Sequence, residues 1–143
     1  MERRRLIVEA LVCLIVARVL IAAVPFRRLS RLFTRKVALR NLTPEARQHV
    51  TTQVRHAISA ATRRAPWPMM CFPQAVAAQD MLRRRGIPTT LYYGAATRAE
   101  ARLSAHVWLK DGDTGVVGHE TASRFAVLAT FSNFRCDSPG TVR

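Results

Sequence analysis

The chain has 143 residues and a formal net charge of +14, from 23 lysines and arginines against 9 aspartates and glutamates. Because 49% of the residues are hydrophobic, disorder is excluded as the default, and the length suffices for one domain with a core. The positive charge favours an acidic partner, such as an anionic membrane surface or an acidic peptide. The basic residues are spread along the chain with few aromatic residues between them, so we expect no nucleic acid partner.

The three cysteines, Cys13, Cys71 and Cys136, are odd in number and show no CxxC spacing. This pattern argues against a disulfide framework and against a zinc site. It fits a reducing compartment, and we expect the protein to be cytoplasmic.

The segment from Leu6 to Val24 is almost entirely apolar, follows three arginines, and is long enough to span a membrane. Glu9 and Arg18 interrupt it on opposite faces of a helix, and each would cost about 2.5–3.5 kcal/mol at a bilayer centre. The apolar residues nearly cancel this cost, and no signal-peptide cleavage motif follows. We favour a helix packed on the core, while association with a membrane surface and a true span stay open.

Two further helices are expected in the N-terminal part. Arg27 to Arg40 is basic with an apolar stripe at helical spacing. Thr43-Pro44-Glu45 is typical of a helix start, and that helix should continue to about Arg63. A proline-rich connection follows, so we divide the chain into an N-terminal helical region, residues 1–63, and a core, residues 64–143, which together form one compact domain.

The central helix is predicted from Cys71 to Gly86, with the sequence CFPQAVAAQDMLRRRG. Pro73 suits the first turn, and Gly86 supplies a left-handed stop after three arginines that favour the carbonyl end. A thiol at the start of such a helix lies near the positive end of the helix dipole, which stabilises the nucleophilic thiolate.

The C-terminal part is expected to form an antiparallel sheet. β-Branched and aromatic residues predict strands at Thr89–Ala95, Leu103–Lys110 and Phe125–Phe131. A turn at Asp111–Gly115 should lead into a return strand from Val116. The fold class predicted is therefore α+β.

Cys71 at a helix start and His106 on a following strand suit thiol chemistry, because the imidazole must take the thiol proton and later protonate the leaving amine. The residues alone leave two other interpretations open. A cysteine is often a small core residue, and a single strand histidine is often structural.

Two stretches, RRAPWPMMCFPQAVAAQDMLRRRGIPTTLYYGAA and AHVWLKDGDTGVVGHETASRFAVLATF, resemble the lasso-peptide leader peptidases. These are transglutaminase-like B proteins related to the C-terminal domain of the microcin-processing B protein. The resemblance covers about Arg64 to Phe131 and implies a transglutaminase-like, papain-like cysteine peptidase core. It implies Cys71 as nucleophile and His106 as general base and acid. The cysteine chemistry itself needs no metal or nucleotide, so we expect no cofactor.

The third catalytic residue departs from the family pattern, which has an aspartate about a dozen residues after the histidine. That position is Gly118 here. We favour Glu120, on the return strand beside His106, as the acid that orients the imidazole. Asp111, Asp113 and the absence of any side-chain acid remain alternatives, although the two aspartates are more simply explained as turn residues.

The resemblance also implies partners: a lasso precursor peptide, a separate leader-recognition protein and a lasso cyclase. The separate recognition protein is expected because only about 60 residues, predicted to be helical, precede the matched region. Two other functions stay open. One is a non-catalytic basic module that presents the precursor to the cyclase, and the other is an acyltransferase of transglutaminase type.

Overall fold

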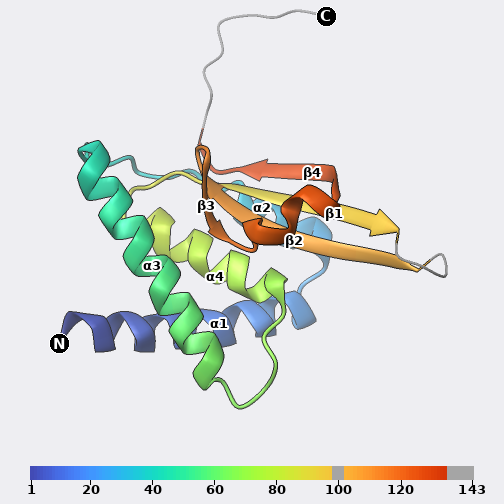
Figure 1. Ribbon diagram of the computed structural model, residues 1–143, viewed down its shortest axis with the longest axis horizontal. Coiled ribbons are helices and arrows are strands. Elements are labelled where there is room, and N and C mark those ends of the chain that lie inside the picture. The colour runs from blue at the N-terminus through green and yellow to red at the C-terminus, as the bar shows by residue number, and fades with distance from the viewer. Residues whose placement is uncertain (98–101, 135–143) are drawn as a thin grey trace, which may run out of the picture.

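The computed structural model describes residues 1–97 and 102–134. Its elements in chain order are α1 (Glu2–Ala23), α2 (Phe26–Phe33), α3 (Pro44–Arg64), α4 (Cys71–Arg84), β1 (Thr90–Thr97), β2 (Leu103–Asp111), β3 (Thr114–Val117), the 3-10 helix η2 (His119–Arg124) and β4 (Ala126–Ser132). Within the described residues the strands form one antiparallel sheet in the order β3-β2-β1-β4. Helices α1, α3 and α4 lie together on one side of this sheet (Figure 1). The predicted α+β class is confirmed.

Helix α4 lies at the centre of the molecule and ends where the sequence predicts. The N–H of Gly86, at φ 75°, donates to the carbonyl of Arg83, and the N–H of Ile87 donates to that of Leu82, each at 3.0 Å. This pair of bonds is a Schellman motif, and the buried side chains of Leu82 and Ile87 add its apolar contact. The small residues on the buried face allow α4 to approach α1, α3 and β2 closely. The buried positions are Pro73, Ala75, Ala77, Ala78, Gln79, Met81 and Leu82.

Helix α1 packs along one face against α3 and α4, as we favoured for the N-terminal apolar segment. Ala10, Leu14 and Ala17 form this face and are 0–2% exposed. Glu9 adds a charged contact, because both its carboxylate oxygens accept hydrogen bonds from Arg85, at 2.7 and 2.9 Å. The hydrophobic core therefore combines residues from the N-terminal helical region and from the C-terminal part of the chain.

The second helix is shorter than predicted, because α2 ends at Phe33 and not near Arg40. Tertiary hydrogen bonds explain the difference. The N–H of Val37 donates to the carbonyl of Asn133, and the N–H of Arg40 donates to that of Gly86. These backbone groups bond to distant parts of the chain and not along a helix, so the segment after Phe33 runs extended. The start of α3 is as predicted, with the Thr43 hydroxyl accepting a bond from the N–H of Ala46 at 3.2 Å.

Candidate active site

Cys71 is the first residue of α4, and its thiol is free and half-buried. The preceding residue, Met70, has extended backbone angles and makes no side-chain cap to the helix. The first N–H groups of α4 therefore have no capping side chain, and they point out of the helix beside the sulfur. An oxygen that gains negative charge next to Cys71 would meet these donors and the positive end of the helix dipole.

His106 lies on β2, with its ring between two aromatic rings. The ring centroid of Phe125 is 4.9 Å away and that of Trp108 is 5.8 Å away. Because side chains alternate along a strand, His106 and Trp108 share one face of the sheet. Gly94 on β1 makes room for the indole, since a Cβ there would lie 2.8 Å from Trp108. The AHVW motif thus has a structural reason, whereas nothing in the sequence indicated that Phe125 would cover the histidine.

The hydrogen bonds of His106 define its tautomer. Nε2 lies 2.6 Å from the carbonyl oxygen of Gly118 and 3.2 Å from the hydroxyl of Thr121. A carbonyl oxygen only accepts, so Nε2 must carry the proton that it donates to Gly118. The neutral ring then has its lone pair on Nδ1, which is the atom available to take a proton.

The structure brings Cys71 and His106 into one groove of about 710 Å³. Each residue lines the groove from its own element, and no hydrogen bond joins the thiol to the imidazole. The remaining lining residues come from α3, α4, β3, η2 and Gly118, and are mostly polar or basic: Arg55, His56, Ile58, Ser59, Thr62, Arg63, Gln74, Val116, Val117, Gly118, Glu120 and Thr121.

Glu120 also lines this groove, but the predicted position on the return strand is wrong. Strand β3 ends at Val117, because Gly118 adopts a left-handed conformation at φ 70° and the chain turns into η2. The side chain of Glu120 is 61% exposed and its carboxylate lies 3.6 Å from Arg55. No contact joins Glu120 to His106, so its orienting role stays a prediction.

The two turn acids lie away from the imidazole. Asp111 is buried and accepts hydrogen bonds from both Arg47, in a two-pronged contact, and the hydroxyl of Thr51 at 3.1 Å. It lies five residues along β2 from His106, so its side chain points to the opposite face of the strand. Asp111 thus ties the β2–β3 hairpin to α3. Asp113 is exposed at the tip of the tight turn.

Cys71 also borders a second hollow. This apolar pocket has a volume of about 580 Å³ and lies between α2, the start of α4 and strands β1, β2 and β4. Its lining residues are Phe26, Met70, Cys71, Phe72, Tyr93, Ala105, Val107, Leu128 and Ala129. Among the described residues, Cys71 is the one that borders both the polar groove and the apolar pocket.

The other cysteines are placed differently. Cys13 lies on α1, where its sulfur accepts a hydrogen bond from Arg84 at 2.9 Å. Burial raises the pKa of the Cys13 thiol, which disfavours the reactive thiolate. Cys136, which we expected to be structural, lies outside the described residues.

A central helix that begins with a cysteine, beside an antiparallel sheet that carries a histidine, supplies the two elements on which papain- and transglutaminase-like enzymes build a thiol site. A family model described as the transglutaminase-like superfamily matches residues 12–130, well over half of the chain. The chain therefore belongs to the transglutaminase-like superfamily, which includes cysteine peptidases and acyltransferases. Comparison with curated proteins and with solved structures finds no significant match.

Proposed function

We propose that this protein is a cysteine peptidase that removes the leader from a ribosomally made lasso-peptide precursor. The observation that carries the proposal is the shared groove, in which Cys71 lies at an uncapped helix start and His106 has its lone pair on Nδ1. Membership of the transglutaminase-like superfamily supports thiol chemistry in general. The narrower choice of a lasso leader as substrate rests on the sequence motifs around Cys71 and His106.

In this mechanism Nδ1 of His106 takes the proton of the Cys71 thiol, and the thiolate attacks the scissile carbonyl carbon. The N–H groups of the first turn of α4 stabilise the resulting oxyanion. The intermediate then breaks its C–N bond, and Nδ1–H gives its proton to the leaving amine. Water, activated by the same nitrogen, hydrolyses the thioester, which releases the leader as an acid and restores the thiol.

The groups that orient His106 are part of the proposal. The Gly118 carbonyl and the Thr121 hydroxyl already contact Nε2, so they can hold the ring with Nδ1 toward the groove without a carboxylate. Gly118 stands where the resembled family has its aspartate, and its backbone oxygen can serve in place of that side chain. Glu120 would need to leave Arg55 and turn toward the ring to take the same role.

The partners follow from the proposed substrate. We propose that a separate recognition protein delivers the leader of the precursor, and that a cyclase uses the amine exposed by cleavage. The groove carries Arg55, His56 and Arg63 from α3, so it suits a polar or acidic stretch of peptide.

The test is mass spectrometry of a candidate precursor incubated with this protein and its recognition protein. We expect Cys71→Ala to abolish cleavage with the fold intact, because a half-buried sulfur leaves little cavity when it is removed. Cys13→Ala is the matched control, a second half-buried helical cysteine, and should cleave at the parent rate. Cleavage by Cys71→Ala would overturn the enzymatic proposal. A product that gains the mass of an added amine in place of water would identify an acyltransferase.

A further inference from the structure

The face of α1 that points away from α3 and α4 is apolar and uncovered. Its residues recur at spacings of three and four, which places them on one side of the helix, opposite Ala10, Leu14 and Ala17. Each is between 39% and 61% exposed: Val8, Val12, Ile15, Val16 and Val19. These five residues form what we call the outer stripe of α1.

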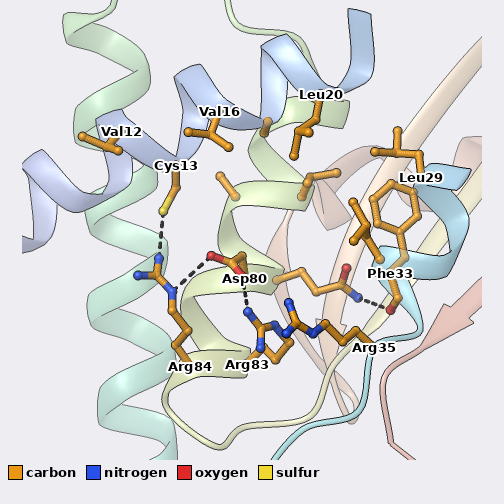
Figure 2. Close-up of a pocket in the computed structure, with 15 residues that line it drawn as sticks. Val12, Cys13, Val16, Leu20, Leu29, Phe33, Arg35, Asp80, Arg83 and Arg84 are labelled. Carbon is orange, nitrogen blue, oxygen red and sulfur yellow. Dashed lines mark hydrogen bonds and ion pairs between the residues drawn. The ribbon is translucent and has the colours of Figure 1, made fainter. Parts of the chain in front are cut away.

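The outer stripe continues into an apolar groove between α1, α2 and α4, with a volume of about 410 Å³. Val12 and Val16 belong to both the stripe and the groove. Figure 2 shows them along α1, with Leu20 at the end of the row that lies near Leu29 and Phe33 of α2. The exposed apolar surface thus extends over two helices, and it is larger than the scattered apolar residues of an ordinary surface.

The surface is bordered by positively charged side chains that are exposed. Arg4 and Arg5 precede the stripe on α1, whereas the basic residues at its other end belong to α2 and the segment after it. These are Arg27, Arg28, Arg31 and Arg35. All six side chains are exposed, and none forms an ion pair within residues 1–97 and 102–134.

Two acids close to the same surface, Asp80 and Glu9, are already paired. Asp80 pairs with Arg83 at 2.7 Å and with Arg84 at 3.1 Å, on α4 across the groove from α1 (Figure 2). Glu9 pairs with Arg84 and Arg85. The surface therefore presents apolar side chains bordered by free arginines, with no free acid from these two positions.

The packing of α1 favours a helix that lies on the protein over one that spans a membrane. The helix is long and apolar enough to cross a membrane by composition, with a mean hydropathy of 2.6 over its most apolar window. A span would have to separate Glu9 from Arg85 and Arg18 from Trp67, whose ring lies 5.5 Å from the guanidinium. It would also expose the face that packs on α3 and α4. The helix can instead lie in the plane of an interface with its outer stripe turned outward.

We propose that the outer stripe and the adjoining groove dock this protein on an anionic membrane surface. Valine and isoleucine enter the boundary between headgroups and acyl chains, and the arginines at both ends meet lipid phosphates. A protein partner fits less well, because the stripe lacks the aromatic and polar anchors that carry most protein interfaces. This inference is independent of the peptidase activity.

The experiment is co-sedimentation of the full chain with vesicles of phosphatidylcholine alone, or of phosphatidylcholine with phosphatidylglycerol. We expect binding to the anionic vesicles, weakened by high salt and at least tenfold weaker to the neutral ones. Val12→Gln with Val16→Gln should reduce binding about tenfold or more, because both side chains leave the interface. Arg27→Gln with Arg31→Gln should reduce it on the order of 30-fold.

Two matched control variants test whether binding depends on this face, and not on exposed apolar residues or positive charge elsewhere on the protein. Leu103→Gln with Val127→Gln removes two other exposed apolar side chains, and Arg102→Gln with Arg124→Gln removes the same charge elsewhere. Both control variants should bind like the parent. The proposal is overturned if the parent does not bind anionic vesicles at low salt, or if the controls lose as much binding as the stripe variants. Circular dichroism of each variant checks that it is folded.

Discussion

The imidazole of His106 is held by neutral groups. In a triad with a carboxylate, the acid both fixes the ring and stabilises the imidazolium that forms during catalysis. Here the Gly118 carbonyl and the Thr121 hydroxyl can fix the ring, and their dipoles replace a full charge. Stacking of His106 between Phe125 and Trp108 adds a second restraint that does not depend on charge. We therefore expect orientation to be the main contribution of these neighbours.

The role of Thr121 can be tested by removing and restoring its hydroxyl. Thr121→Ala should lower kcat for leader cleavage about tenfold, the rough value of one hydrogen bond, with KM nearly unchanged because Thr121 acts through His106. Thr121→Ser should restore the rate. A loss that serine does not restore, or one confined to KM, would contradict a positioning role. Single-turnover cleavage at saturating recognition protein provides the measurement.

The same assay decides between Thr121 and Glu120. If the neutral groups orient His106, Glu120→Gln costs little, because the carboxylate is exposed and faces Arg55. If Glu120 turns toward the ring once substrate is bound, as the sequence led us to expect, the variant should lose orders of magnitude in turnover. That result would restore Glu120 as the third catalytic residue and make Thr121 secondary.

The side chains of this site can be predicted from the sequence better than its backbone groups can. Cys71 and His106 carry signals in residue type, helix position and strand position, and the structure brings both to one groove. The Gly118 carbonyl carries no such signal, because every residue has one and only the left-handed turn at φ 70° aims it at His106. Phe125 was predicted as part of a strand, and its contact with the ring depends on where η2 returns to the sheet.

At the scale of elements, α1 is attached to the end of α4 by charge as well as by apolar packing. The hydrogen bond from Arg85 lowers the pKa of Glu9 below its ordinary value of 4.5, and the charges of Arg85 and Arg84 act in the same direction, against partial desolvation. A carboxyl group with a lowered folded-state pKa stabilises the fold above its unfolded pKa. It loses that contribution as the pH falls through the folded value.

Glu9→Gln should therefore destabilise the protein at neutral pH by about 1–2 kcal/mol, since the pair is partly buried and Arg85 would lose its partner. The difference from the parent should shrink below pH 4.5 and vanish once Glu9 is protonated in both states. Denaturant unfolding at several pH values measures it. Asp113→Asn is the control, an exposed turn acid that should change stability by less than about 0.5 kcal/mol at every pH. A pH-independent loss for Glu9→Gln would contradict the ionic contact.

The elements were predicted best where local signals decide. The start of α3 at Thr43 and the end of α4 at Gly86 follow capping rules that act within a few residues. The end of α2 depends on contacts with distant parts of the chain, and the end of β3 depends on the conformation of one glycine. Both elements therefore end earlier than the sequence predicts. The sequence after Phe33 has apolar residues at helical spacing, but the N–H groups of Val37 and Arg40 donate to distant carbonyls, so no helix forms there.

At the scale of the whole molecule, the sheet and helices form two unlike hollows that both border one thiol. The polar groove contains His106 and the basic residues of α3, whereas the pocket is formed by apolar residues of α2 and three strands. In the proposed peptidase mechanism, the chemistry assigns a direction to the substrate. His106 must protonate the leaving amine, so the leaving side of the peptide lies in the polar groove. The acyl side then extends past Cys71 toward the apolar pocket.

This orientation predicts which substrates are cleaved. Peptides with a large apolar side chain close to the cut on the acyl side should show kcat/KM at least tenfold higher than peptides with aspartate there, since burying such a side chain contributes about 1.5–3 kcal/mol. Leu128→Gln, at the rim of the pocket, should reduce this preference. Val127→Gln changes a neighbouring exposed residue that does not line the pocket, so it should leave the preference unchanged. Equal cleavage of both peptides would contradict the assignment of the pocket, and an apolar preference on the leaving side would mean that the peptide binds in the opposite direction.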